Sequence, residues 1–169
     1  MNLKKQKGQL FSLDLIVASI TFLMIILLTM VTFNQINQTI LFAEEENNRN
    51  EASLNAAKQL LATPGSPANW ENLTDSNNVF SIGIVNTKNE IDFKKMEKLS
   101  DLNFTNYNVV KKLLGAAKYD LKIDIIKHQD KSVLAEFGLE PDVNVSVSSV
   151  NRFGIYNGTD VVLRVKVFG

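Results

Sequence analysis

Residues 1–33, MNLKKQKGQLFSLDLIVASITFLMIILLTMVTF, decide the fold of this chain. A basic leader with three lysines (1–8) precedes an apolar segment at 10–33, whose one charged residue is Asp14. The uncharged part, 15–31, has 17 residues, which is just long enough to cross a hydrocarbon core of about 30 Å. The sequence therefore predicts a membrane-crossing helix with an acid near its start.

The charges around this segment predict its orientation. Lysines on the N-terminal side place that end in the cytoplasm and the rest of the chain outside. An ordinary secretory signal fits less well, because its apolar region has about 7–15 residues and a small-residue cleavage site follows it. The polar residues at 34–37 offer no such site. A signal anchor that stays in the membrane accounts for all of these features.

The junction between leader and helix carries a more specific pattern. Gly8, Gln9, Ser12 and Asp14 occur in KKQKGQ followed by LFSLDLIVA. This segment resembles the class III signal peptides of archaeal type IV pilin-like proteins. The resemblance implies that a prepilin peptidase cuts on the cytoplasmic side, before the apolar helix, and that Ser12 and Asp14 belong to the assembly segment.

The resemblance leaves two registers for the cut. Residue types favour a cut after Gly8, whereas the spacing of Ser12 and Asp14 favours a cut after Gln9. We favour the cut after Gly8. Either cut leaves a new ammonium near Asp14, and the resemblance implies that this acid pairs with the ammonium of a neighbouring subunit or with its own. The alternative is that Asp14 is hydrated at the headgroup level.

The helix is expected to continue well beyond the membrane. No Gly or Pro occurs from Gln9 to Thr63, apolar residues recur at helical spacing, and Pro64-Gly65 then ends the helix. A helix over 10–62 has 53 residues and a length of about 80 Å. We therefore divide the chain into a leader (1–8), a long helix (9–62) and a head domain (63–169).

The head is expected to be α+β, with an antiparallel sheet and two short helices. Asn-Gly at 157–158 between two alternating runs is a strong hairpin signal. Trp70, in a loop at 63–74, is expected to be buried in the head. The expected elements are strands at 79–85, 119–127, 143–155 and 161–168, and helices at 90–102 and 107–114, the latter ended by Gly115. Short stretches of the head also resemble archaeal pilin-like proteins: Thr63-Pro64-Gly65, Asn69-Trp70, Ile82-Gly83, Lys98-Leu99, Tyr107 and Leu114-Gly115.

Composition argues against several functions. Cysteine is absent, and the only histidine, His128, has no second histidine or cysteine with which to form a transition-metal site. Asp120 and Asp124 share a strand face and could bind calcium, but a solvated face is the favoured interpretation. With 18 basic and 18 acidic residues and no basic patch, nucleic acid is not an expected partner. We expect neither an enzyme nor a cofactor.

Five Asn-X-Ser/Thr sequons indicate an exported glycoprotein. They begin at Asn37, Asn72, Asn103, Asn144 and Asn157. Asn37 would be buried if the helices pack into a filament core, Asn157 also suits a turn, and Asn72 and Asn103, in expected loops, are the best candidates. The alternative is that the chain is simply rich in asparagine.

The resemblance and the helix together predict a function. We expect a structural subunit that lies in the membrane before assembly, then polymerises with other pilin subunits into an extracellular surface filament that serves in adhesion. The alternative is a membrane-anchored extracellular binding module that never polymerises and needs no cleavage.

Overall fold

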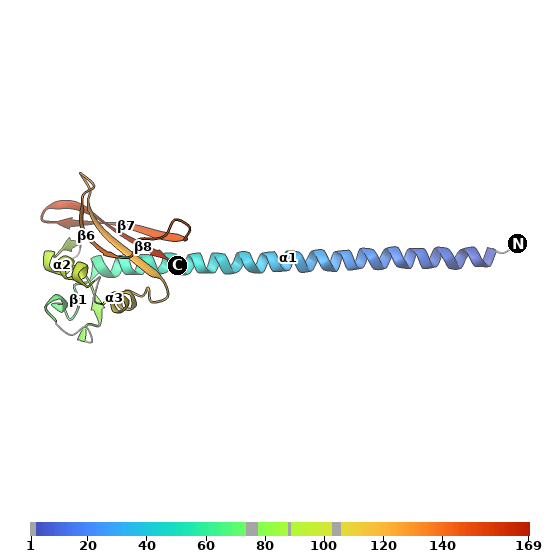
Figure 1. Ribbon diagram of the computed structural model, residues 1–169, viewed down its shortest axis with the longest axis horizontal. Helices are drawn as coiled ribbons and strands as arrows, with labels where there is room; N and C mark the ends of the chain where they lie inside the picture. Colours follow the sequence, from blue (N-terminus) through green and yellow to red (C-terminus); the bar gives the residue numbers. More distant parts are fainter. Residues whose placement is uncertain (1–2, 74–77, 88, 103–105) are drawn as a thin grey trace. The chain divides into compact units, whose positions relative to one another are not determined.

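The structure is a computed structural model that describes the backbone of residues 3–73, 78–87, 89–102 and 106–169, and side chains from residue 13 onward (Figure 1). Within it, the chain divides into two compact units, Met1–Glu45 and Glu46–Gly169. Each unit is described by itself below.

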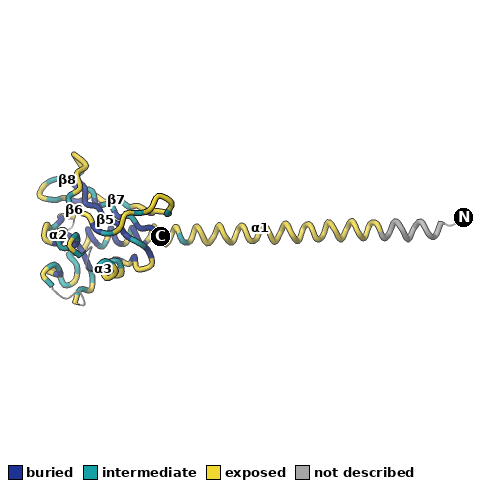
Figure 2. The backbone as a smooth tube through the Cα atoms, in the orientation of Figure 1, coloured by how far each residue is buried: buried dark blue, intermediate teal, exposed yellow. Residues whose placement is uncertain are grey.

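The first unit consists of the N-terminal part of one long helix, α1 (Leu3–Ala62). Every described residue of α1 from Leu13 to Glu44 is exposed (Figure 2). The helix ends at Ala62, as predicted, but it begins seven residues before the predicted start at Leu10. The helix can extend into the leader because the leader contains no proline, and its single glycine lowers helix stability by only about 1 kcal/mol.

The second unit packs the last part of α1 against a sheet. One face of this helical stretch is buried, at positions that recur every three or four residues. The buried side chains are those of Arg49, Ala52, Ser53, Ala56, Ala57, Leu60 and Leu61. Their mostly small size lets the sheet approach the helix closely.

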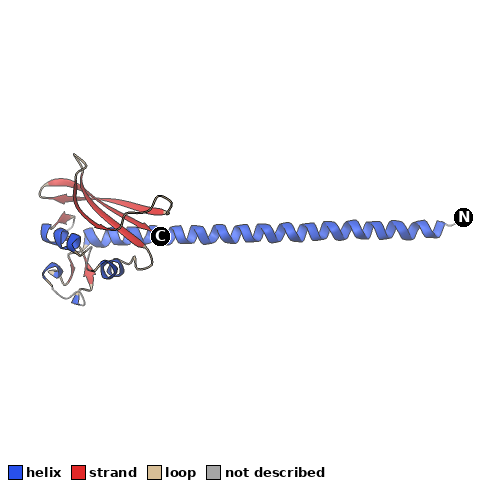
Figure 3. Ribbon diagram, in the orientation of Figure 1, coloured by secondary structure: helices blue, strands red, loops and turns tan. Residues whose placement is uncertain are grey.

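Among the described residues, the main sheet has six strands in the order β3-β4-β7-β8-β5-β6. Figure 3 shows the strands in red and the helices in blue. Neighbouring strands are antiparallel except β4 and β7, which pair in parallel at Glu90 and Ile155. A separate two-stranded sheet joins β1 to β2. The strands are β1 (Gly65–Ser66), β2 (Ser81–Ile82), β3 (Val85–Thr87), β4 (Glu90–Ile91), β5 (Asp120–Lys127), β6 (Val133–Gly138), β7 (Val147–Tyr156) and β8 (Thr159–Phe168). The short helices are the 3-10 turn η1 (Trp70–Asn72), α2 (Phe93–Asp101) and α3 (Tyr107–Leu113).

This architecture confirms the α+β prediction. The predicted hairpin is present as β7–β8, and both turn residues, Asn157 and Gly158, have positive φ values of 49° and 74°. Two positive φ values are what a two-residue type I′ turn requires. The strand predicted at 119–127 is β5, and the helix predicted at 107–114 is α3, after which Gly115 has φ +78°.

Four parts of the prediction were wrong in detail. The strand predicted at 79–85 is interrupted after Ile82, and the chain pairs again only from Val85. The helix predicted at 90–102 begins with strand β4, because the carboxylate of Asp92 accepts hydrogen bonds from the amides of Lys94 and Lys95 and caps α2. The strand predicted at 143–155 starts at Val147. Strand β6 was not predicted at all.

The prediction for Trp70 is confirmed. Its side chain is 2% exposed, and its indole Nε1–H donates to the carbonyl of Gly83 at 2.8 Å. Position 83 requires glycine, because a Cβ there would lie 1.8 Å from the carbonyl oxygen of Thr63. The buried ammonium of Lys95 donates to the carbonyls of Pro64 and Val85, so the turn that follows α1 is fixed from several directions.

Candidate functional site

The predicted processing and assembly residues lie at the start of α1. The backbone of Gly8, Gln9 and Ser12 is helical, and their side chains lie outside those that the structure describes. Asp14 is exposed, and its carboxylate has no ion-pair partner among the described side chains. Asp14 is also the only charged residue from Leu13 to Ala43.

The apolar segment that follows Asp14 is exposed on every side of the helix. Side chains spaced around the whole circumference, such as Leu15, Ile16 and Val17, are each more than half exposed. By length and composition α1 can cross a membrane. An apolar surface of this extent, left in water, would be unfavourable, so this part of the helix requires a lipid or protein environment.

The polar side chains inside the apolar segment are satisfied within the helix itself. The hydroxyl groups of Ser19, Thr21, Thr29 and Thr32 donate to the carbonyl four residues earlier, at 2.7–2.9 Å. In a hydrocarbon environment an unpaired hydroxyl is costly, and this back-bonding removes the cost. Among the described side chains of this segment, Asp14 is therefore the one whose polarity the helix does not satisfy.

The structure places four of the five sequon asparagines at exposed positions. Asn37 is exposed on α1, Asn72 in η1, Asn144 in a turn and Asn157 at the tip of the β7–β8 hairpin. The side-chain amide of Asn72 donates to the carboxylate of Glu71 at 3.2 Å. Asn103 lies outside the described residues. Exposure is a requirement for glycosylation and is met at all four described positions.

Asp120 takes part in a network that fastens α3 to the sheet. Its carboxylate accepts a hydrogen bond from the hydroxyl of Tyr107 at 3.1 Å and pairs with the ammonium of Lys111 at 3.1 Å. The same hydroxyl accepts from the amide of Leu121 at 2.9 Å. Burial, together with the nearby charge of Asp120, raises the pKa of Tyr107 to about 12. Asp120 thus has a structural role.

Asp124 lies among cations of the same sheet face. Its carboxylate is 3.8 Å from the ammonium of Lys122 and 3.9 Å from that of Lys166. Burial raises the pKa of Asp124, and the two lysines partly oppose this effect. Among the described residues no group of three or more His, Asp or Glu side chains is placed to hold a metal ion.

His128 has a packing contact rather than a chemical partner. Its ring meets the ring of Phe153 edge to face, with 5.7 Å between the centroids. Both side chains are exposed. No pair of a nucleophile and a base involving His128 is formed by the residues that the structure describes.

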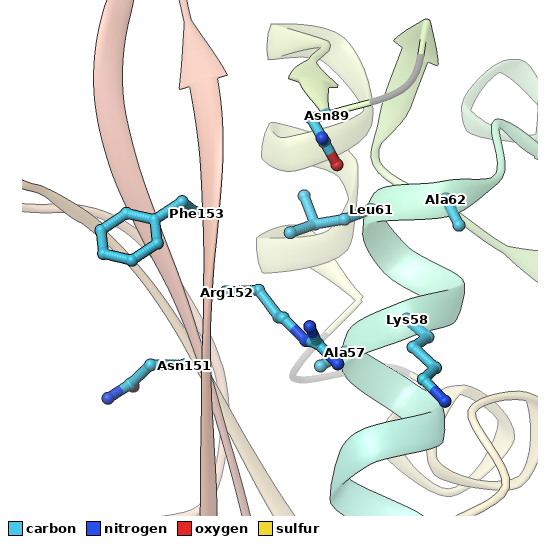
Figure 4. A pocket seen from close by; sticks show the side chains of 8 residues that line it. All are labelled: Ala57, Lys58, Leu61, Ala62, Asn89, Asn151, Arg152 and Phe153. Atoms are coloured by element: carbon cyan, nitrogen blue, oxygen red, sulfur yellow. The ribbon is translucent and has the colours of Figure 1, made fainter.

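A groove in the second unit was not foreseen from the sequence. It has a volume of about 400 Å³ and lies between the last turns of α1 and strand β7 (Figure 4). The groove is lined by Ala57, Lys58, Leu61 and Ala62 from α1, Asn151, Arg152 and Phe153 from β7, and Asn89. The only sequence signal was the alternation of β7, which places Arg152 on the same face as the buried Ser148 and Gly154.

Comparisons with known proteins give no further information about this site. No protein-family model matches the chain, and neither a curated protein nor a solved structure shows significant similarity to it.

Proposed function

We propose that this chain is a structural subunit of an archaeal type IV pilus-like surface filament. A prepilin peptidase cuts after Gly8 or Gln9, and the mature subunit polymerises with other pilin subunits through the apolar part of α1. The filament serves in adhesion. The subunit is held in the membrane before assembly and lies outside the cell afterwards.

The observation that carries the proposal is the surface of α1. From Leu13 to Phe33 the helix is exposed and apolar on all sides, with hydroxyl groups satisfied internally and Asp14 as the lone charge. Such a helix suits two apolar surroundings in turn, first lipid and then a bundle of identical helices. In the bundle, an ammonium created by cleavage would provide the counter-charge that Asp14 lacks among the described residues.

A second function is supported by part of the same evidence. A signal anchor that keeps residues 1–8 would hold the head outside the cell as a binding module and would need no polymerisation. The apolar segment supports this alternative equally well, whereas the Gly8–Gln9 junction favours the filament.

The decisive experiment is mass-spectrometric sequencing of the N-terminus of the protein isolated from its native cells. A start at Gln9 or Leu10 supports the filament subunit and fixes the register of the cut. A start at Met1 contradicts processing and favours the anchor. Gly8→Ala is the matched variant, because it changes the junction while leaving the charges of the leader in place.

Polymerisation needs its own test. Cells are sheared, and the released material is sedimented and probed for the subunit. We expect the wild-type chain in the filament fraction and the Asp14→Ala chain in the membrane fraction. Equal assembly of the two chains would contradict the proposed role of Asp14. Asp101→Ala, which removes an exposed acid from the head, is the control.

The glycoprotein part of the proposal is tested on the same material. Peptides that contain Asn72, Asn103, Asn144 and Asn157 are analysed for attached glycans by mass spectrometry. Modification at one or more of these positions supports an exported glycoprotein. Finding all of them unmodified would remove this part of the proposal.

A further inference from the structure

The edge of β7 that faces away from β8 is unpaired over most of its length. β8 covers one edge of β7 from Val147 to Tyr156, whereas β4 pairs with the other edge only at Ile155. Among the described residues no strand continues this second edge from Val147 to Phe153. An open edge presents a row of unpaired amide and carbonyl groups that can pair with another extended chain.

The register shows which groups face this open edge. The two-residue hairpin makes Tyr156 and Thr159 a hydrogen-bonded pair, and such pairs alternate along an antiparallel ladder. The odd-numbered residues of β7 therefore point their amides and carbonyls away from β8. The amide of Ile155 confirms this assignment, since it donates outward to the carbonyl of Asn89 at 2.7 Å. The next outward-facing groups are those of Phe153 and Asn151.

The groove lies at this edge. Figure 4 shows the side chains of Asn151 and Phe153 on one side of β7 and that of Arg152 on the other, directed towards α1. Asn151 and Phe153 can therefore line the groove with their main chain. The opposite wall, formed by Ala57 and Leu61, is apolar. A free anion could use only the amides of this edge, whereas an extended peptide can use both the amides and the carbonyls.

The charge of the groove defines the partner further. Two exposed cations, Lys58 and Arg152, line the groove, and none of the described residues that line it is acidic. Neither cation has an ion-pair partner in the part of the chain that the structure describes. A strand laid beside β7 would direct every second side chain towards α1, where these cations meet carboxylates and Leu61 meets an apolar group.

We propose that this groove binds an extended, acidic segment of another polypeptide by strand addition to β7. The preferred segment has carboxylates two positions on either side of an apolar residue, all on the face that meets α1. The inference does not depend on the filament proposal, because a groove in the head can bind such a segment whether the chain polymerises or remains anchored.

The test measures binding of a fluorescein-labelled peptide, Thr-Glu-Thr-Val-Thr-Glu-Thr, to the full chain in lipid nanodiscs by fluorescence anisotropy. Peptides with Gln or Lys in place of both Glu residues are the matched probes. We expect the Glu peptide to bind at least about tenfold more tightly than either of them. Absence of binding up to about 1 mM, or equal binding of the Glu and Gln peptides, would overturn the proposal.

Charge variants connect binding to the groove. Lys58→Glu and Arg152→Glu should each weaken binding of the Glu peptide at least about tenfold and strengthen binding of the Lys peptide. Lys112→Glu, on the exposed surface of α3, should leave both affinities unchanged. An equal effect of all three variants would show general attraction to the surface and would overturn the assignment.

A main-chain variant tests strand addition itself. Asn151→Pro removes an outward amide that β8 does not use, and proline is tolerated on strand edges when its nitrogen faces solvent. Asn151→Ala keeps the amide and serves as the control, with melting temperatures to confirm that both variants fold. We expect Asn151→Pro alone to abolish binding. If the wild-type chain instead self-associates without binding any peptide, and Asn151→Pro abolishes this self-association, the edge pairs with a second copy of the chain. That result would overturn the proposed partner.

Discussion

Replacing Trp70 by phenylalanine should destabilise the head by about 2–4 kcal/mol. The indole is 2% exposed and donates its only hydrogen bond, at 2.8 Å, to the buried carbonyl of Gly83. Leaving that carbonyl unpaired costs about 1–3 kcal/mol. The smaller ring removes buried apolar surface and leaves a cavity, which adds about 1 kcal/mol.

The assay is thermal and urea unfolding of the full chain in nanodiscs, followed by circular dichroism. For a unit of this size, the expected loss corresponds to a fall in melting temperature of roughly 8–16 °C. Phe80→Leu is the control, because Phe80 is 74% exposed and its replacement should change stability by less than about 0.5 kcal/mol.

The same residue offers an independent measurement. Trp70 is the only tryptophan in the chain, so selectively excited tryptophan emission reports on this site alone. We expect blue-shifted emission that is protected from acrylamide in the folded protein. Emission typical of exposed tryptophan, or a loss below about 1 kcal/mol for Trp70→Phe, would refute the reasoning that this side chain holds the turn after α1 in place.

Three further predictions concern other parts of the chain. Gly83→Ala should lower stability by about 3 kcal/mol or more, because the new Cβ would clash with a backbone carbonyl oxygen. Gly158→Ala should cost only about 1 kcal/mol, because the space around this position is open. Equal losses of the two variants in urea unfolding would contradict this reasoning. Glu140→Gln should lower stability by at most about 1 kcal/mol at pH 7, since its carboxylate pairs with Lys122 at 2.7 Å from an exposed position. Lys122 lowers the pKa of Glu140 in the folded chain. The loss of stability should therefore be present above the pKa of this carboxyl in the unfolded chain, and it should disappear as the pH falls through its pKa in the folded chain. A loss that persists in acid would argue against an ion pair. Replacing both Ile25 and Ile26 by Asp should sharply reduce the membrane-inserted fraction in a carbonate-extraction assay, since two acids at the helix centre cost about 5–7 kcal/mol, as much as the apolar side chains supply. Replacing both by Leu should leave the fraction unchanged, and full insertion of the double Asp variant would contradict a membrane-crossing role.

The elements that the sequence predicted well are those with a local signal. The β7–β8 turn follows from Asn157-Gly158, whose residues tolerate positive φ, and the end of α1 follows from Pro64-Gly65. Strand β6 lacks a signal of this kind. Its sequence, VLAEFG, alternates poorly, and it is a strand because its backbone pairs with β5 from Lys122 to Ile126. β5 and β6 are consecutive strands, but the connection between them at 128–132 contains no Asn-Gly pair or other glycine, and strand pairing cannot be inferred from propensity.

The candidate sites differ in how far the sequence alone could indicate them. The candidate processing and assembly residues, which stay a prediction, could be named because a basic leader, a glycine and an acid follow one another within a short stretch of sequence. The groove could not be named, since its walls come from α1 and β7, about 90 positions apart, and its open edge exists only because β4 is two residues long. Arg152 in isolation is indistinguishable from any other charge on a strand.

The energetics of α1 determine which experiment can reveal the role of Asp14. The twelve Leu, Ile, Val and Phe side chains from Leu15 to Phe33 favour insertion by roughly 4–7 kcal/mol on insertion scales. An acid near the helix end costs less than the 2.5–3.5 kcal/mol it would cost at the centre, so the helix inserts with or without Asp14. Removing this charge should therefore change anchoring little. An anchor would tolerate Asp14→Ala. A filament in which Asp14 pairs with an ammonium would lose assembly, while its subunits remained in the membrane. The distribution of the variant between membrane and filament fractions therefore distinguishes the two proposals.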